Sequence, residues 1–592
     1  MADPQRRART WTPRRVREIL DRTQWLPLEA EVPELGPGER RAIDHVVEAG
    51  RAIGELYEGQ RHREAHIARR QLLARHEALG RPERTLDLLR LYRLFDGPIA
   101  TTLDNQLEAF LPVSPWTPGG AMYPDGVGGD EIRAFADAHP EQHADLLGTS
   151  TIIRRTSAEN LAHDLRTLQR YPVLAGTHPG LLDHLERLAG RGTRAAKAEP
   201  FYAVGYAVAW PRQTLAVAQH LHAASRALED EDRDLSSFLR LRSLGMLADD
   251  VEVADPAWAR GSFRNLDVVV GPWEVYDDGV MGLRASHGLA LLAMHEQSTR
   301  EVREWAGHVD AIDATLTYAG PRRRTELVPM ASYDLLAVFG GARNVLAETL
   351  PNDPEVTRRY GRRILMRRNF GMDPRAFASN TARYAAVMDP AIVDEQTVEA
   401  TFTQTVTHEL AHYVGPDRHA DGRTFADALG EDADIIEELK AEVMSFSIAV
   451  FLERAGDIDA AHRRGVLAAL IHSGLRINPP LRSQTYPIVR TMIINRFLAD
   501  GVLLRRGDRY AIDHERALAT ITPYVDEIVA LQSTGTRDDV AASIDRWVAW
   551  NEDDARIGAL VAAAPVRRFS YEAGPLEPAP AGLEGDFGLG RA

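Results

Sequence analysis

The chain has 592 residues, a length too great for one ordinary compact core, so we expect two lobes, or one large unit with two layers around a cleft. Its formal net charge of −16 argues against nucleic acid as the main partner. The sequence contains no cysteine, which excludes disulfide bonds and thiolate chemistry and limits metal ligands to nitrogen and oxygen atoms.

The first part of the chain predicts mainly helices. Residues 1–40 predict an arginine-rich tail and a first helix, without the apolar stretch of a secretory signal. Apolar residues at helical spacing predict two or three helices over 40–95 and several more over 130–250. The segment 111–130 is dense in proline and glycine and is expected to be a loop. No run of about 18 apolar residues occurs, so we expect a cytoplasmic protein with no membrane partner.

Strand-like segments follow near the middle of the chain. LDVVV (266–270) and GRRILMRR (361–368) predict strands, whereas residues from 378 to 550 predict mainly helix. The expected fold class is α+β, predominantly α. We predict the following division: an N-terminal tail and first helix (1–40), a mixed α/β lobe (41–285, with part of 345–375), a helical lobe (286–565) and a C-terminal tail (566–592).

The most informative motif is HELAH, at residues 408–412. On a helix, His408 and His412 lie one turn apart on the same face, where both imidazoles can reach one ion. Glu409 lies beside them, placed to take a proton from a water on the metal. Catalytic zinc needs three protein ligands and an open fourth position. The motif therefore supplies two of the three ligands.

A second motif, EELKAE at residues 437–442, can supply the third ligand. Glu438 and Glu442 are four residues apart, so one can bind the metal while the other supports a ligand histidine. They stand on a predicted buried helix, where carboxylates need partners. A metal and its histidines would be such partners.

A competing pattern, HExxHxxGxxH, would take its third ligand from position 418. The chain has Arg418 there, which cannot bind a cation, and His419 comes one residue late. We therefore prefer a glutamate as the third ligand. Co²⁺ and Mn²⁺ remain alternatives to zinc, since geometry and metal supply decide which ion is bound. The expected site holds one Zn²⁺ per chain, bound by His408, His412 and Glu438.

Several segments together resemble the dipeptidyl peptidase III family of zinc peptidases. They occur in the family's order and span roughly residues 90 to 510. The resemblance implies a two-lobed enzyme with a wide cleft, in which a helical lobe carries zinc and a mixed lobe contains a small β-barrel core. Besides the two metal motifs, the segments are GAMYPD (120–125), VVVGPWEVYDDGVMGLRAS (268–286), LPNDPEVTRRYGRRILMRRN (350–369) and RSQTYPIVRTMIINRFLADG (482–501).

The resemblance also implies a role for each residue of the site. Family members remove dipeptides from the unblocked N-terminus of short peptides. Carried over by position, His408, His412 and Glu438 resemble the zinc ligands, and Glu409 resembles the general base. Glu437 and Glu442 resemble the carboxylates that orient the histidines, and Tyr276 resembles the tyrosine that donates to the developing oxyanion. Glu274 and Asn352 resemble the residues that bind the substrate's N-terminal end, and Arg490 resembles the arginine that binds toward its carboxyl end.

Three features depart from the family pattern. Many members have six residues in the first motif, whereas HELAH has five, which restores the simple helical spacing. Thr349 stands where a second asparagine is common, and this weakens the expected subsite for the peptide N-terminus. Tyr486 stands where the family has a histidine that assists the transition state. Tyr486 can still donate one hydrogen bond to the developing oxyanion, in addition to the one from Tyr276. Unlike a histidine, it cannot become a cation near neutral pH.

The leading functional hypothesis is a zinc-dependent peptidase that releases N-terminal dipeptides, using a water activated by Glu409. One alternative keeps the zinc and acts on a non-peptide small molecule in specialised metabolism, because the subsites are altered. Another is a peptide-binding protein without catalysis, which the intact Glu409 argues against. The expected partners are short peptides or small amides, with no nucleic acid and no membrane. The sequence leaves the oligomeric state open.

Overall fold

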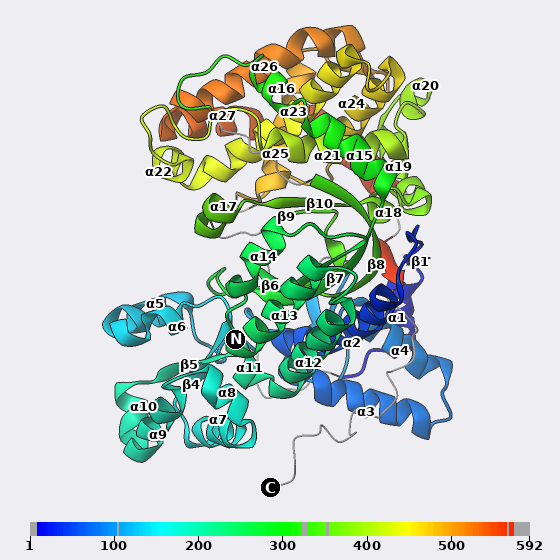
Figure 1. Cartoon of the computed structure of the whole chain (residues 1–592). Helices are drawn as coiled ribbons and strands as arrows, with labels where there is room; N and C mark the ends of the chain where they lie inside the picture. The colour runs from blue at the N-terminus through cyan, green and yellow to red at the C-terminus, as the bar shows by residue number, and fades with distance from the viewer. Residues whose placement is uncertain are drawn as a thin grey trace.

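Two groups of helices lie on either side of one five-stranded sheet in the computed structural model (Figure 1). The structure describes residues 9–103, 106–275, 277–322, 330–350, 354–482, 484–564 and 568–572. The predicted α+β class, predominantly α, is confirmed. Among the described helices, none is both long and apolar enough to cross a membrane.

The sheet curls into a half-barrel, which corresponds to the predicted small β-barrel core. Its neighbouring strands pair antiparallel except for β8 and β10, which run parallel. It includes strands on both sides of residue 285, and the predicted lobe boundaries stay predictions. In sheet order, the strands are β6 (Leu266–Glu274), β7 (Ser286–Met294), β8 (Met330–Gly340), β10 (Arg363–Arg367) and β9 (Ala347–Leu350).

The helices below the sheet in Figure 1 pack on it through one long helix, α2 (Pro37–Arg61), which contacts β7 and β8. Helix α2 begins at a proline, whose missing N–H is not needed there, and buries a stripe of apolar residues at helical spacing. Helix α12 packs on α2 and on α13. The other helices of this group are α3 (Ala65–Ala78), α4 (Glu83–Leu94), α12 (Pro211–Leu228) and α13 (Arg233–Ala248). The short helix α14 (Asp255–Arg260) packs on α13.

A smaller group of elements with its own apolar core lies beside these helices. Strands β4 and β5 pair antiparallel within it. Its elements are α5 (Gly129–Ala138), α6 (His143–Leu146), β4 (Thr151–Arg155), α7 (Ala158–Arg170), α8 (Pro172–Thr177), α9 (Leu181–Arg191), α10 (Thr193–Ala198), β5 (Phe201–Gly205) and α11 (Tyr206–Ala209).

The helices above the sheet in Figure 1 enclose the largest apolar core of the described residues. Helix α23 lies at its centre and packs on α21, α24, α25 and α26. The helices of this group are α15 (Glu296–Ala306), α16 (Val309–Asp313), α19 (Pro374–Val387), α20 (Pro390–Val393), α21 (Val398–Ala411), α22 (Phe425–Leu429), α23 (Ala433–Ala455), α24 (Ala460–Gly474), α25 (Thr485–Ala499), α26 (His514–Thr534), α27 (Arg537–Val548) and α28 (Glu552–Ala563).

Short elements complete the description. Strands β2 and β3 form one hairpin, and β11 and β12 form another. Two short helices flank β10, one before it and one after it. These elements are β2 (Ile99–Thr101), β3 (Leu107–Ala109), α17 (Pro354–Tyr360), α18 (Arg368–Gly371), β11 (Leu503–Arg506) and β12 (Arg509–Ile512).

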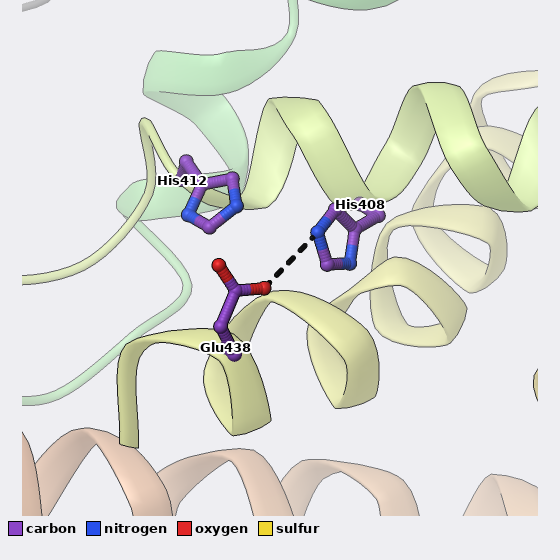
Figure 2. A group of neighbouring side chains, drawn as sticks. All are labelled: His408, His412 and Glu438. Carbon is purple, nitrogen blue, oxygen red and sulfur yellow. Dashed lines mark ion pairs between the residues drawn. The ribbon is translucent and has the colours of Figure 1, made fainter. Parts of the chain in front are cut away.

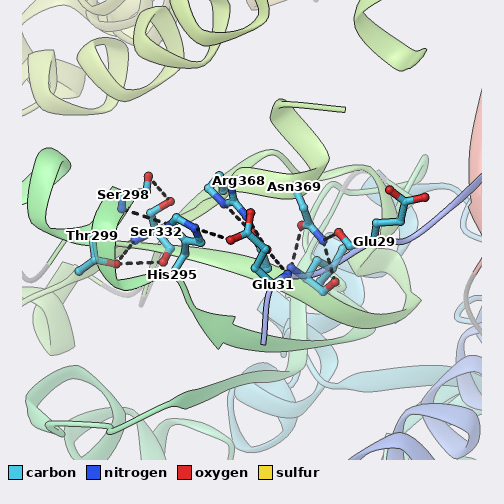
Figure 3. Close-up of polar contacts among 10 residues, drawn as sticks. Glu29, Glu31, His295, Ser298, Thr299, Ser332, Arg368 and Asn369 are labelled. Carbon is cyan, nitrogen blue, oxygen red and sulfur yellow. Dashed lines mark hydrogen bonds and ion pairs between the residues drawn. The ribbon is translucent and has the colours of Figure 1, made fainter. Parts of the chain in front are cut away.

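Strands from the first and last parts of the described chain pair with each other. After α1 (Pro13–Leu20), strand β1 (Thr23–Pro27) pairs in parallel with β13 (Arg568–Glu572), which lies within the segment predicted as a tail. The segment that follows β1, with Glu29 and Glu31, is held to the sheet by polar and charged contacts (Figure 3). Arg368 lies 2.9 Å from Glu31 and 2.7 Å from Asp334. Asn369 donates a hydrogen bond of 2.7 Å to the carbonyl of Glu29.

Candidate metal centre

The HELAH motif lies at the C-terminal end of helix α21, so its histidines stand on a helix as the spacing predicted. The side chain of Thr397 caps the start of this helix by accepting a hydrogen bond from the backbone N–H of Ala400. His408 lies in the last turn and His412 is the helical C-cap, so the four-residue spacing remains helical. The two imidazole centroids are 5.0 Å apart and their planes are nearly perpendicular. Both rings face α23, which packs against α21.

The third member of the cluster, Glu438, lies in the second turn of α23 (Figure 2). One ligand atom from each of His408, His412 and Glu438 can be chosen so that all lie within 4.8 Å of one another. His408 Nε2 is 3.4 Å from Glu438 Oε2. Two atoms that each lie about 2.0 Å from a tetrahedral zinc ion are about 3.3 Å apart. The side chains therefore need little movement to bind one ion.

The unsatisfied carboxylate oxygen supports a metal in this position. Glu438 Oε2 is buried and accepts no hydrogen bond from the residues that the structure describes. Its neighbour within ion-pair distance is His408 Nε2, at 3.4 Å, so the carboxylate stands beside a ligand nitrogen without a hydrogen bond to it, and a divalent cation between the two would satisfy both. Two nitrogens and one oxygen, with no sulfur, form a donor set typical of catalytic zinc. The residues present thus fit the expected ion.

The electrostatics of the cluster favour a positive charge. Burial lowers the pKa of His408, but Glu438, Glu442 and Glu409 outweigh it and raise that pKa to about 9. Burial raises the pKa of Glu438, and the neighbouring His408 and His412 more than reverse this, so it is lowered. A proton on His408 thus takes the place that a cation would take, and proton and metal compete for the site.

Two further carboxylates of α23 lie beside the histidines. Glu437 Oε1 lies 2.9 Å from His412 Nδ1. This contact places the ring proton on Nδ1 and presents Nε2 as the ligand atom. Glu437 also accepts hydrogen bonds from Lys440 Nζ, at 3.0 Å, and from Gln532. The buried ammonium group of Lys440 is thereby paired with a carboxylate.

Glu442 lies on the other side of the cluster, with Oε2 3.9 Å from His408 Nδ1. Gln404 Nε2 donates to Glu442 Oε2 at 3.0 Å, and Arg490 Nε donates to Oε1 at 3.1 Å. The guanidinium of Arg490 therefore contacts a residue of the metal centre, a contact that the sequence did not indicate. Its role toward a substrate's carboxyl end stays a prediction.

The carboxylate of Glu409 is hydrogen-bonded to a residue of the sheet. Thr349, in β9, donates a hydrogen bond of 3.0 Å from Oγ1 to Glu409 Oε2. In the family resemblance, Thr349 is only a departure in the expected subsite for the peptide N-terminus. No local sequence signal links the two residues, because sheet pairing and helix packing bring β9 to α21.

Tyr486 is the second residue of α25 and lies beside the cluster. Its ring centroid is 6.5 Å from that of His408, and the guanidinium of Arg490 lies 5.1 Å from its ring centre. The side chain is 41% exposed. Burial of its remaining part, with the negative charges of Glu438 and Glu409, raises the pKa of Tyr486. The phenol therefore stays protonated and can act as a hydrogen-bond donor.

The other predicted residues of the site are not all placed. Tyr276 and Asn352 lie outside the described residues, and Glu274 ends strand β6 while its side chain is outside the description. The competing ligand His419 is occupied elsewhere, since its Nδ1 lies 2.9 Å from Asp421 and its Nε2 lies 3.2 Å from the carbonyl of Gly535. It does not belong to the cluster that the structure shows.

Sequence comparison alone gives a limited result. No family model matches the chain. Nudix hydrolase 3 of Arabidopsis thaliana is 19% identical over 330 residues, which cover 53% of this chain and 42% of that protein. The chain thus matches less than half the length of this relative.

Comparison of structures is more informative. Fold and site together define a predominantly helical α+β protein with a His–His–Glu cluster suited to a metal ion, which suggests a metallohydrolase. The particular fold is that of dipeptidyl peptidase III. The structure of that protein from Caldithrix abyssi superposes with a TM-score of 0.75 at 19% identity, covering 93% of this chain and 98% of that one. The protein from Corallococcus sp. strain EGB gives 0.71 at 19% identity, covering 95% and 98%.

Proposed function

We propose that the chain is a zinc-dependent peptidase that releases dipeptides from the N-terminus of short peptides. The observation that carries the proposal is the His408, His412 and Glu438 cluster, with Glu409 beside it, on the fold of dipeptidyl peptidase III. Zinc, when bound, supplies a Lewis acid for the scissile carbonyl and lowers the pKa of a water toward about 7.

The chain's own residues supply the rest of the proposed reaction. Glu409, held by Thr349, takes a proton from the attacking water and returns it to the leaving amine. Tyr486 Oη, protonated beside the cluster, donates to the developing oxyanion. Glu437 and Glu442 keep the two imidazoles in orientation. Tyr276 as a second donor, and Glu274, Asn352 and Arg490 as substrate-binding groups, rest on the family resemblance.

The proposal is tested by hydrolysis of a panel of dipeptidyl-arylamides, including Arg-Arg-naphthylamide, with protein of known zinc content. We expect release of the intact dipeptide, loss of the activity with a chelator, and recovery when zinc is returned. In a second arm, Glu409→Gln should keep its zinc and lose nearly all turnover. A Glu409→Gln variant with the turnover of the wild type would contradict the mechanism.

A second candidate function keeps the same centre and changes the substrate. Two observations favour it: Thr349 engages Glu409, and Tyr486 occupies the place of the family's histidine. Both alter the surroundings of the reacting group. Zinc-loaded protein that leaves every dipeptidyl-arylamide intact, yet cleaves a small-molecule amide in a Glu409-dependent manner, would favour this candidate.

A further inference from the structure

A cavity of about 680 Å³ adjoins the metal centre and contains positive charge only. Its walls come from α19, α21, α24, α25 and the loop after α24. Three arginines line it, Arg383, Arg476 and Arg490, and none of the lining residues is an aspartate or a glutamate. We call this cavity the arginine pocket. It lies in a chain whose net charge is −16, so the absence of carboxylates there is not a general property of the molecule.

Two of the three arginines have no counter-charge. Arg383 and Arg476 form no ion pair with a carboxylate in the described part of the chain. Arg383 Nε is buried and has no hydrogen-bond acceptor among those residues. Burial, followed by the positive charges of Arg490 and Arg383, lowers the pKa of Arg476. The guanidinium groups thus repel one another, and partly buried cations without partners are costly.

The neighbouring histidine supplies no compensation. Burial, with the charge of Arg383, lowers the pKa of His472 to about 4, so this ring is neutral near pH 7. Gln396 Nε2 donates to His472 Nδ1 at 2.9 Å, which is consistent with a neutral ring. Two guanidinium groups of the pocket, those of Arg383 and Arg476, are therefore not neutralised by the described residues around them.

We propose that the arginine pocket binds a small molecule that carries at least two negative charges, a phosphate monoester or a di- or tricarboxylate. Guanidinium groups bind phosphate and carboxylate oxygens through paired hydrogen bonds. The two arginines without partners match two ligand charges. The volume lies within the range of small-molecule sites. Asn380, Ser473 and Asn478, which also line the pocket, offer polar groups for the rest of the molecule.

The pocket is connected to the metal centre through one carboxylate. Gln404 and Arg490 line the pocket, and both bind Glu442. An anion in the pocket competes with Glu442 for Arg490, and Glu442 lies 3.9 Å from His408 Nδ1. Binding of an anion would therefore change the position of the Glu442 carboxylate relative to His408. This linkage is reciprocal, because coupling between two binding sites acts equally in both directions.

Binding is measured directly, without substrate, so the result does not depend on the proposed peptidase activity. Isothermal titration calorimetry with inorganic phosphate and with citrate uses the full chain, and glycerol serves as the neutral control. We expect saturable binding that weakens with added sodium chloride. Arg383→Gln and Arg476→Gln should each weaken it at least about tenfold, because each removes a charged hydrogen-bond partner. Tighter binding of phosphate than of citrate would identify a phosphate ester as the ligand class, and the reverse would identify a carboxylate.

Arg464→Gln is the matched control, since Arg464 stands on α24 outside the pocket and lies 3.5 Å from Glu395. This variant should bind both anions as the wild type does. Thermal melting gives a second measurement. Each anion should raise the Tm of the wild type and of Arg464→Gln, and raise that of Arg476→Gln less at the same concentration. No saturable binding by the wild type, wild-type affinity in both pocket variants, or an equal loss in Arg464→Gln would overturn the proposal.

Discussion

The hydroxyl of Thr349 donates a 3.0 Å hydrogen bond to the carboxylate of Glu409, and so connects the curled sheet to the metal centre. Thr349 comes from β9, at the sheet's edge, and Glu409 from the last turn of α21. A general base works only when its carboxylate is held toward the water that it deprotonates. The threonine therefore acts as a positioning residue for the proposed base.

Thr349→Val removes this hydrogen bond while keeping the shape of the side chain. We expect kcat to fall about tenfold, since a hydrogen bond to a charged group contributes about 1.5–3 kcal/mol. KM should change little, because the base does not bind the substrate in the ground state. Steady-state kinetics on a dipeptidyl-arylamide give both constants. Thr349→Ser retains the donor and should restore the rate; if Thr349→Val keeps the full kcat, the threonine does not position the base.

Glu438→Gln tests the third ligand. The amide oxygen is a much poorer zinc ligand than a carboxylate, so we expect zinc affinity to fall by at least about a hundredfold, given that changes in outer contacts alone cost about 10–100-fold. Competition with a chromogenic chelator measures the affinity. Glu431→Gln, at an exposed position just before α23, serves as the control and should leave affinity unchanged. Full affinity in Glu438→Gln would remove this residue from the ligand set.

The parts of the site that the sequence predicts are those set by helical periodicity. The spacing of His408 and His412 follows from the repeat of one helix. The choice of Glu438 rests instead on the need of zinc for a third ligand, and the cluster in the structure includes it. The resemblance to dipeptidyl peptidase III extends this to the fold as a whole. The roles assigned to Tyr276, Asn352 and Glu274 stay predictions.

Contacts between elements that are distant in the chain could not be predicted in this way. Strands β7 and β8 are buried on both faces, so their residues show no alternation of polar and apolar side chains. Strand β13 gains its structure by pairing with β1, more than 500 residues earlier. The arginine pocket gathers side chains from α19, α21, α24, α25 and the loop after α24, and nothing in the sequence places Arg383 beside Arg476.

Tyr486→Phe tests the proposed oxyanion donor. The phenol stays protonated, so its hydroxyl is available at neutral pH. Loss of one such donor costs up to about 10²–10³ in kcat, and we expect a fall of at least tenfold with zinc content unchanged. Tyr486→His introduces the residue that the family uses and should retain much of the rate, with a new dependence on pH. Equal kcat for Tyr486→Phe and the wild type would show that the hydroxyl takes no part.

A buried histidine away from the metal centre predicts how stability depends on pH. His287, in β7, is 2% exposed, and burial lowers its pKa to about 3. In the unfolded chain a histidine has a pKa of about 6.5. Between these values the unfolded chain binds a proton that the folded chain does not bind. The contribution of the neutral His287 to the free energy of unfolding is therefore fully present above about pH 6.5. It is lost progressively as the pH falls toward 3, at up to about 1.4 kcal/mol per pH unit.

His287→Phe removes this titration and keeps an aromatic ring against Tyr206, whose centroid lies 5.3 Å away. Urea unfolding at about pH 7 and about pH 4.5 gives the two free energies of unfolding. We expect the wild type to lose about 2.5 kcal/mol more than the variant between these conditions. His222→Phe, at an exposed position on α12, should leave the pH dependence of the wild type intact. Parallel curves for His287→Phe and the wild type would mean that His287 accepts its proton in the folded protein as readily as in the unfolded chain.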